Sequence, residues 1–198
     1  MTGMLGVIAD DFTGATDVAS ALVSRGFTTI VVSGPVTPDS DSTGWGLERY
    51  DAVVVALKSR TSAREDAVRD SLAAYELLET AGCERFYFKY CSTFDSTPHG
   101  NIGPVIDALL ERIGSHSTVA VPSVPANGRT VYQGTLFVGR TLLENSSMRN
   151  HPLTPMTDSN VLSLLDPQSV NTVGLVDHRI VRAGADAVSS HIDTLTIL

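Results

Sequence analysis

The sequence predicts an α/β fold in which a doubly wound, mainly parallel sheet lies between helices, giving three layers. Two observations support this class. Short runs rich in β-branched residues alternate along the chain with longer segments of helical periodicity. Those helical segments are long enough to serve as the crossovers that parallel strands require. A β-hairpin excursion near residues 129–139 is expected to interrupt the alternation.

The first half of the chain contains four predicted strands, at residues 5–9, 27–33, 51–57 and 85–90. Helices are expected between them at 15–25 and from Ser62 to about 81. Gly26 stands at the stop position of the first helix. Ser62 and Glu65 fit the S-x-x-E capping box, and the apolar stripe of the second helix is typical of a core face.

The second half is less regular. A helix is predicted at 105–113 and a fifth strand at 118–121, followed by two short β-like runs around Gln133 and Gly134. A proline-broken loop then leads into a short helix capped near Asp158 or Ser159. Further strands are expected at 173–176 and 194–198, with an amphipathic helix at 183–192 between them.

Size and charge limit the functions to consider. The 198 residues suffice for one good-sized domain, and 42% hydrophobic residues can fill its core. A net charge of -8 repels phosphate backbones, so no nucleic-acid partner is expected. No run reaches the roughly 18 apolar residues of a membrane span, and the N-terminus lacks a signal-peptide pattern, so we expect a cytoplasmic protein with no membrane partner.

Cysteine and histidine give no sign of a metal site. Cys83 and Cys91 form no C-x-x-C motif and are expected to be core or near-core residues. The histidines have no ligand spacing, and we interpret four of them as surface or structural residues: His99, His151, His178 and His191. We therefore predict no metal bound by this chain.

Polar residues gather where four of the predicted strands end. The stretches are "DDFTGATD" after the first strand, "KSR" after the third, "CSTFDSTPHGNIG" after the fourth and "PSVPANGR" after the fifth. Ligands of open parallel sheets bind beyond the carboxyl ends of the strands. We therefore expect these four loops to converge on one crevice.

Asp10 and Asp11 stand side by side directly after the first strand. Like charges this close cost stability unless a cation, a proton or a substrate hydroxyl compensates. The pair could accept hydrogen bonds from a polyol, act as a general base or hold Mg²⁺. Alternatively, one carboxylate caps the following helix and the other is solvated. Thr13 and Gly14 let a backbone approach a ligand at a helix start, where amide donors favour anions.

Three cationic side chains lie at the ends of predicted strands: two directly after the third strand and one near the end of the fourth. Lys58 and Arg60 are candidates for clamping a substrate carboxylate, because guanidinium offers a planar pair of donors. The alternative is a surface pair that precedes the helix. Lys89, within a strand, would be costly to bury without an anionic partner. Asp10, Asp11 or Asp95 could supply that partner.

The loop after the fourth strand is the densest set of hydroxyl-binding groups: Ser92, Thr93, Asp95, Ser96, Thr97 and Asn101. Gly100 and Gly103 flank the next helix start and suit a small polar ligand. Asn127 and Arg129 either close the crevice or shape the hairpin turn. No Walker A sequence occurs and no G-x-G-x-x-G follows the first strand. The residues thus predict a substrate site without a recognisable nucleotide cradle.

Several stretches resemble the N-terminal domain of the four-carbon acid sugar kinase family. They are "GVIADDFTGATD", "LKSR", "FYFKYCSTFDSTPHGNIGPV", "NGRTVYQGTLFVG" and "MRNHPLTPMTDSN", and the likeness covers nearly the whole chain. The resemblance implies an ATP-dependent phosphotransferase with an alcohol acceptor, which phosphorylates the terminal O4 hydroxyl of a four-carbon acid; 3-oxo-tetronate is the expected acid. It also implies that residues 1–198 form the sugar-acid-binding half of a two-domain enzyme.

The resemblance also implies roles for the candidate residues. ATP and Mg²⁺ would be bound mainly by the C-terminal nucleotide-binding domain, which is absent from this chain. This chain alone is therefore expected to be inactive. Asp10 and Asp11 are the catalytic candidates, and one of them could assist deprotonation of O4. The expected substrate-binding residues are Asp10, Asp11, Thr13, Gly14, Lys58, Arg60, Lys89, Ser92, Asp95, Ser96 and Asn101.

Two other functions stay open at this point. A chain that is naturally this short would be a non-catalytic sugar-acid-binding or regulatory module. A Mg²⁺-dependent receiver or haloacid-type module also places acids after its first strand. However, Lys58 stands near the position of the acceptor aspartate of a receiver, and Asp10-Asp11-Phe12 is not the Asp-x-Asp of the haloacid type. A homo-oligomer is compatible with every alternative.

Overall fold

The computed structural model describes residues 3–35 and 45–195. It divides into two compact units, Met1–Tyr90 and Cys91–Leu198. The first unit contains a parallel sheet with its helices, and the second contains a small antiparallel sheet among short helices and loops.

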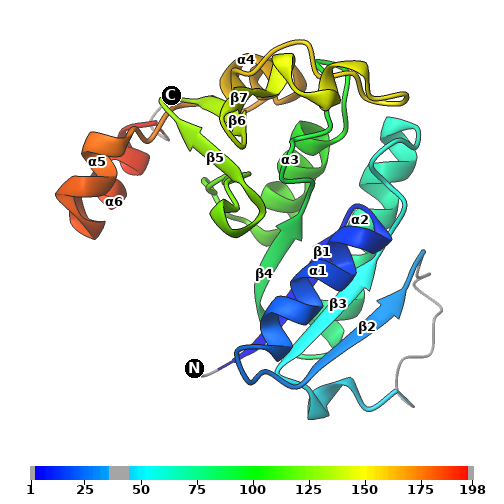
Figure 1. The fold of residues 1–198 in the computed structure, drawn as a ribbon. Coiled ribbons are helices and arrows are strands. Elements are labelled where there is room, and N and C mark those ends of the chain that lie inside the picture. The colour runs from blue at the N-terminus through cyan, green and yellow to red at the C-terminus, as the bar shows by residue number, and fades with distance from the viewer. Residues whose placement is uncertain (1–2, 36–44, 196–198) are drawn as a thin grey trace. The chain divides into compact units, whose positions relative to one another are not determined.

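The first unit is a four-stranded parallel sheet in the order β2-β3-β1-β4. Its strands are β1 (Met4–Ala9), β2 (Thr29–Ser33), β3 (Ala52–Ala56) and β4 (Cys83–Lys89). The crossover helix α1 (Phe12–Val23) joins β1 to β2, and α2 (Arg64–Thr80) joins β3 to β4 in the opposite direction along the sheet. The two helices therefore cover opposite faces, as Figure 1 shows. The predicted doubly wound, three-layer arrangement is confirmed in this unit.

The alternation of side chains along β1 explains these layers. Val7 and Ala9 are fully buried against Ala15 and Ala19 of α1. Gly6 faces the other way, and a Cβ built on it would lie 3.1 Å from a methyl of Leu78 on α2. Because both faces of the sheet are covered, β1 and β3 read as continuous apolar runs rather than as alternating ones.

One helix start in this unit differs from the prediction. The capping box of Ser62 and Glu65 is wrong, because α2 begins after Ala63 and this residue makes no side-chain cap. The Ser62 hydroxyl lies near the backbone oxygens of Ser59 and Ala63 instead. The predicted helix itself is present. Glu65 and Asp66 stabilise its first turn, because they lie near the positive end of the helix dipole.

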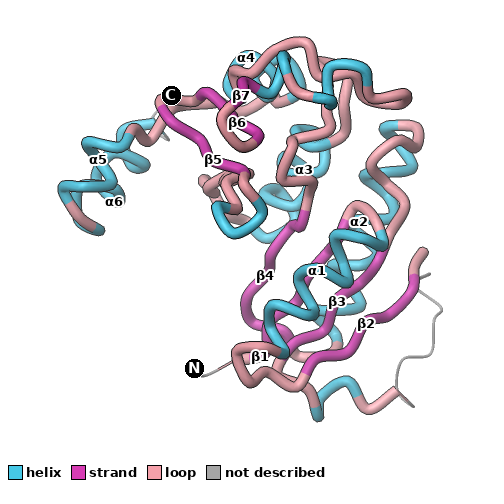
Figure 2. The backbone as a smooth tube through the Cα atoms, in the orientation of Figure 1, coloured by secondary structure: helices cyan, strands magenta, loops and turns pink. Residues whose placement is uncertain are grey.

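The second unit begins with α3 (Ile102–Ile113) and continues into the predicted hairpin. The antiparallel strands are β5 (Arg129–Tyr132), β6 (Thr135–Val138) and the two-residue β7 (Thr141–Leu142), shown as short strands in Figure 2. Gln133 and Gly134 connect β5 to β6 with φ of 52° and 76°. Positive φ at both central residues is typical of the two-residue turn whose twist matches that of the two hairpin strands.

The described residues of this unit include three further α-helices, α4 (Val161–Leu165), α5 (His178–Ala183) and α6 (Ala185–Leu195), besides short 3-10 turns. The cap of α4 is neither Asp158 nor Ser159 but Asn160, whose side chain accepts hydrogen bonds from the amides of Leu162 and Ser163. The described helices include none with the length and apolar character needed to cross a bilayer.

Three predicted strands of this unit are wrong. Residues 118–121 and 173–176 lie outside every helix and strand, and residues 194–195 belong to α6 instead of a last strand. Residues 196–198 lie outside the described residues. A strand needs a neighbour whose backbone pairs with it, and neither 118–121 nor 173–176 has one among the described residues.

Candidate functional site

Asp10, Asp11 and Arg60 form one ion-paired group at the carboxyl end of the parallel sheet. The Arg60 guanidinium binds Asp10 with two hydrogen bonds, from Nε to Oδ2 at 3.0 Å and from Nη2 to Oδ1 at 2.8 Å. Its third nitrogen, Nη1, lies 2.9 Å from Oδ2 of Asp11. A single planar cation thus compensates the repulsion between the two carboxylates.

The parallel register of β1 and β3 brings this group together. Ala9 pairs with Ala56, and the amide of Leu57 donates to the carbonyl of Ala9 at 2.9 Å. The amide of Arg60 then donates to the carbonyl of Asp10 at 3.2 Å. The "KSR" stretch therefore runs directly beside the "DD" stretch, and the guanidinium needs only its own length to reach both acids.

Asp10 lies in a low-dielectric position. Only 3% of the residue is exposed. Burial raises the pKa of Asp10 above its ordinary value; Arg60 opposes this, Asp11 adds to it and Lys89 opposes it more weakly. Burial and Arg60 thus act on the pKa of Asp10 in opposite directions, and a carboxyl group with a raised pKa is a candidate general base.

Asp11 has a second task as the cap of α1. Its Oδ1 accepts a hydrogen bond from the amide of Gly14 at 2.7 Å while its Oδ2 meets Arg60. Gly14 is buried, and a Cβ there would lie 2.7 Å from that oxygen and 3.3 Å from Nζ of Lys89. Thr13 is exposed in the same turn. The close packing explains why the chain has glycine at this position.

Two lysines lie around the carboxylate pair, defined as Asp10 and Asp11. Lys89, at the end of β4, donates from Nζ to the carbonyl of Tyr90 at 2.7 Å. Lys58 is exposed, with its Nζ 5.4 Å from the centre of the Phe12 ring. Because Arg60 already binds both acids, the two lysines are better suited than Arg60 to bind an external anion. Three cations against two carboxylates leave one net positive charge when all five groups are ionised.

The residues of the second candidate group lie in a tight turn of the second unit, in residues 91–103, here named the polar loop. The Thr93 hydroxyl donates to Oδ1 of the buried Asp95 at 2.7 Å and lies 3.0 Å from Sγ of Cys91. Phe94 and Asp95 have φ of 64° and 42°. Non-glycine residues seldom adopt this left-handed backbone, and such strain is concentrated at ligand sites.

Gln168 holds the end of the polar loop and was missed by sequence reasoning. Its Oε1 accepts from the hydroxyl of Ser96 at 3.3 Å and from the amide of Gly103 at 3.1 Å. Its Nε2 donates to the carbonyl of Leu164 at 2.8 Å. No local pattern marks Gln168, because its partners in the polar loop are more than 60 positions earlier in the sequence.

The remaining candidates have local positions that agree with their expected elements. Asn101, buried, immediately precedes α3, and Ser92 is half-buried at the start of the polar loop. The guanidinium of Arg129 donates to the carbonyl of Asn127, and the backbone of Arg129 pairs with that of Val124. These contacts favour the hairpin-shaping interpretation of Asn127 and Arg129 over that of closing a crevice.

The structure thus brings together the candidates of the first unit, whereas Ser92, Asp95, Ser96 and Asn101 belong to the second. The convergence of all loops on one crevice stays a prediction. Within the described residues, no group of three or more His, Cys, Asp or Glu side chains is placed to hold a metal ion.

Comparison with known proteins gives a consistent result. Residues 5–196 match the family described as the sugar-binding N-terminal domain. The chain is 53% identical over 193 residues to a 3-oxo-tetronate kinase of Pectobacterium atrosepticum, covering 96% of this chain and 44% of that relative. The chain therefore spans less than half the length of the curated relatives it matches.

Two solved structures are similar as well. A crystal structure of a Haemophilus influenzae protein has a TM-score of 0.88 and 49% identity, over 96% of this chain and 45% of that one. A Bordetella bronchiseptica domain of unknown function, described with bound citrate and as a domain-swapped dimer, has a TM-score of 0.69 and 31% identity over 82% of this chain and 39% of its own.

Replacing Arg60 tests the role of this residue as the counter-charge. In Arg60→Gln, Asp10 keeps its burial but loses its cation, so we expect the free energy of unfolding at pH 7 to fall by about 3 kcal/mol. A raised folded-state pKa means that folding favours protonated Asp10; this stabilisation is present at low pH and is lost as pH rises. The deficit should therefore shrink between pH 7 and pH 5 in urea denaturation.

A matched control is Arg69→Gln, since Arg69 pairs with Asp66 and Asp70 on the exposed surface of α2. Exposed pairs of this kind contribute little, so its unfolding curve should stay close to that of the unmodified chain at both pH values. Equal effects of the two substitutions would contradict the assigned role of Arg60.

Proposed function

We propose, since the chain belongs to the family of sugar-binding N-terminal domains, that it is the acid-sugar-binding part of an ATP-dependent kinase. The reaction is phosphorylation of the terminal O4 hydroxyl of a four-carbon sugar acid, and 3-oxo-tetronate is the proposed acid, as for a 3-oxo-tetronate 4-kinase. The names of the curated relatives, about half identical over nearly all of this chain, support the proposal.

The observation that supports it most is the carboxylate pair held by Arg60 with two lysines around it. A four-carbon sugar acid presents one carboxylate and several hydroxyl groups. The lysines can attract the carboxylate, and the Asp oxygens can accept hydrogen bonds from hydroxyl groups. The carboxylate pair and its three cations carry one net positive charge together, so this group suits an anionic polyol better than a neutral sugar.

In this proposal Asp10 and Asp11 have different tasks. Asp11 is already bound to the amide of Gly14 and to Arg60, so it orients the start of α1 and a substrate hydroxyl near it. Asp10, whose pKa is raised by burial, is the better candidate to accept the proton of O4. Phosphoryl transfer depends mainly on positioning, so the base assists the reaction without dominating it.

The polar loop would contact the other hydroxyl groups of the acid. Its buried Asp95 is fixed by Thr93, and Ser96 is held by Gln168. These internal hydrogen bonds preorganise the loop, which lowers the entropy lost on binding a flexible small ligand. The citrate of the Bordetella bronchiseptica domain is a comparable ligand, a small carboxylate with a hydroxyl group.

The described residues do not fit ATP or Mg²⁺. They include no cluster of three acids, and the stretch from the end of β1 through the first turn of α1 contains Gly14 as its single glycine. We therefore assign ATP and Mg²⁺ mainly to the part of the longer kinase that follows this domain, in a cytoplasmic enzyme. A homo-oligomer is compatible with the domain-swapped dimer of the Bordetella bronchiseptica relative.

The second candidate function is a non-catalytic sugar-acid-binding or regulatory module. The carboxylate pair with its lysines suits an acid sugar in this function too, and the residues that the structure describes offer no nucleotide cradle. The two functions agree on ligand binding and differ on phosphoryl transfer in the longer protein.

Calorimetric titration with a tetronate ligand tests the proposed site. Asp10→Asn and Asp95→Asn each remove an acceptor charge, so we expect binding to weaken at least about tenfold, or ~1.4 kcal/mol. Asp17→Asn, on the exposed side of α1, is the matched control and should bind like the unmodified chain. Unchanged affinity in both Asp10→Asn and Asp95→Asn would show that the ligand binds elsewhere.

A turnover assay separates the two functions. The chain of 198 residues, given ATP, Mg²⁺ and 3-oxo-tetronate, should show no phosphorylation above background. A single polypeptide in which Leu198 is followed by the remainder of the Pectobacterium atrosepticum kinase should show it. Turnover by the chain alone at an ordinary kinase rate of about 1–100 s⁻¹ would contradict the assignment of ATP to the second part.

A further inference from the structure

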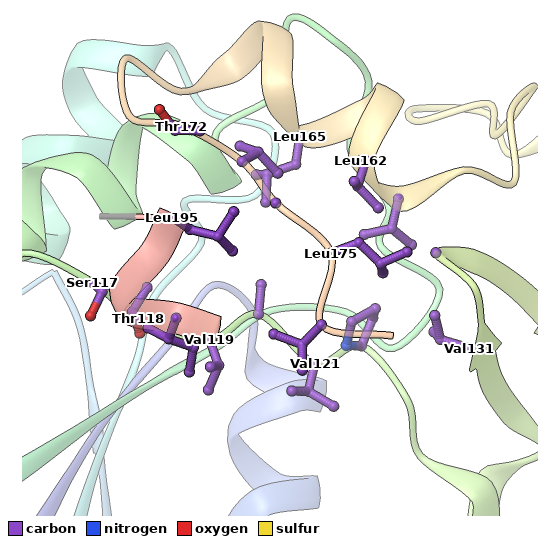
Figure 3. Close-up of a pocket in the computed structure, with 18 of the residues that line it drawn as sticks. Ser117, Thr118, Val119, Val121, Val131, Leu162, Leu165, Thr172, Leu175 and Leu195 are labelled. Atoms are coloured by element: carbon purple, nitrogen blue, oxygen red, sulfur yellow. The ribbon is translucent and has the colours of Figure 1, made fainter. Parts of the chain in front are cut away.

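The second unit contains a groove whose lining shares only Gly103 with the polar loop. It has a volume of about 790 Å³ and is lined mainly by apolar side chains. Figure 3 shows that Val119 and Val121, Leu175, and Leu162 with Leu165 of α4 surround the same space. Leu195 of α6 also lies on its lining.

Two stretches of this lining are strand-like in sequence but unpaired in structure. They are residues 118–121, "TVAV", and residues 173–176, "VGLV". Within the described part of the chain, the backbone of 118–121 forms no hydrogen bond. The backbone of 173–176 accepts one, at the carbonyl of Leu175 from Nε2 of His191 (3.1 Å). β-branched stretches with free amide and carbonyl groups are acceptors for an added strand.

Two apolar side chains of this lining are largely exposed. Val119 is 59% exposed and Val121 is 61% exposed, and both face the groove from the same stretch. Covering two such side chains favours binding by about 25 cal/mol per Å² of apolar surface removed from water. An extended peptide would bury them and also satisfy the unpaired backbone groups, which a compact small molecule would not.

We propose that this groove accepts a β-strand from the part of the longer kinase that follows the domain. The proposal rests on the proposed function, in which the chain is the first part of a longer protein. The family is described as an N-terminal domain, and the matched region makes up 44% of the Pectobacterium atrosepticum relative. More than half of that relative is therefore available to supply an apolar, β-branched segment, and pairing with it would turn 118–121 or 173–176 into the strand that its sequence predicts.

Hydrogen exchange tests the proposal on two polypeptides: the chain of 198 residues, and the same chain continued by the remainder of the Pectobacterium atrosepticum kinase. We expect the amides of 118–121, 173–176 or both to exchange at least about tenfold more slowly in the longer polypeptide, because pairing protects them. Unchanged exchange of both stretches in a folded longer polypeptide would overturn the proposal.

Substitution of the lining provides the matched test. Val121→Asp puts a charge in the groove and should abolish the added protection in the longer polypeptide. Val170→Asp changes a side chain that is 92% exposed and outside the lining, and should leave the protection intact. Protection that survives Val121→Asp would place the strand elsewhere and overturn the proposal.

Two further measurements keep the test decisive. If the joined polypeptide fails to fold, exchange is measured on the intact Pectobacterium atrosepticum kinase, in which the aligned stretches must be protected. Concentration-dependent protection in the shorter chain, with dimers in ultracentrifugation, would identify a second copy as the occupant and overturn the proposal. Tetronate titration of Val121→Asp should match that of the unmodified chain, so a failed sugar-acid site and a failed strand site give different results.

Discussion

The structure of the candidate site depends on the need to balance two adjacent carboxylates at the end of a buried strand. Asp10 is nearly inaccessible to water, and Asp11 stands next to it. Arg60 meets both acids with separate nitrogens, so one guanidinium replaces the water that each carboxylate loses. Without that cation, burial and the adjacent, partly exposed Asp11 would both oppose ionisation of Asp10.

This balance decides what the neighbouring groups can do. Because Arg60 is engaged by the chain's own acids, the proposed function assigns the substrate carboxylate to Lys58 and Lys89. Asp11 fixes the start of α1 through Gly14, whereas burial raises the pKa of Asp10 and Arg60 opposes that rise. Ion pairing, helix capping and proton affinity are therefore set by the same three side chains.

The sequence predicts the first unit and the hairpin of the second unit well because their signals are local. Apolar runs, helical periodicity and the Gln133-Gly134 turn each act over a few residues, and the strands, helices and hairpin follow them. The partner of the carboxylate pair is a different kind of information, since Arg60 is 50 positions away and reaches Asp10 only through the register of β1 and β3. Gln168 is missed for the same reason. Residues 118–121 and 173–176 have strand propensity, but a strand also requires a partner, and their own sequence cannot supply it.

The most direct test of the account is a double-mutant cycle on the free energy of unfolding with Arg60→Gln, Asp10→Asn and the double variant. Residues in one ion-paired network couple by about 0.5–3 kcal/mol, so the two effects should be non-additive by more than ~1 kcal/mol at pH 7. The double variant should lose less stability than the sum of the single variants. Additive effects within about 0.3 kcal/mol would show that Arg60 does not balance Asp10, and would contradict the account.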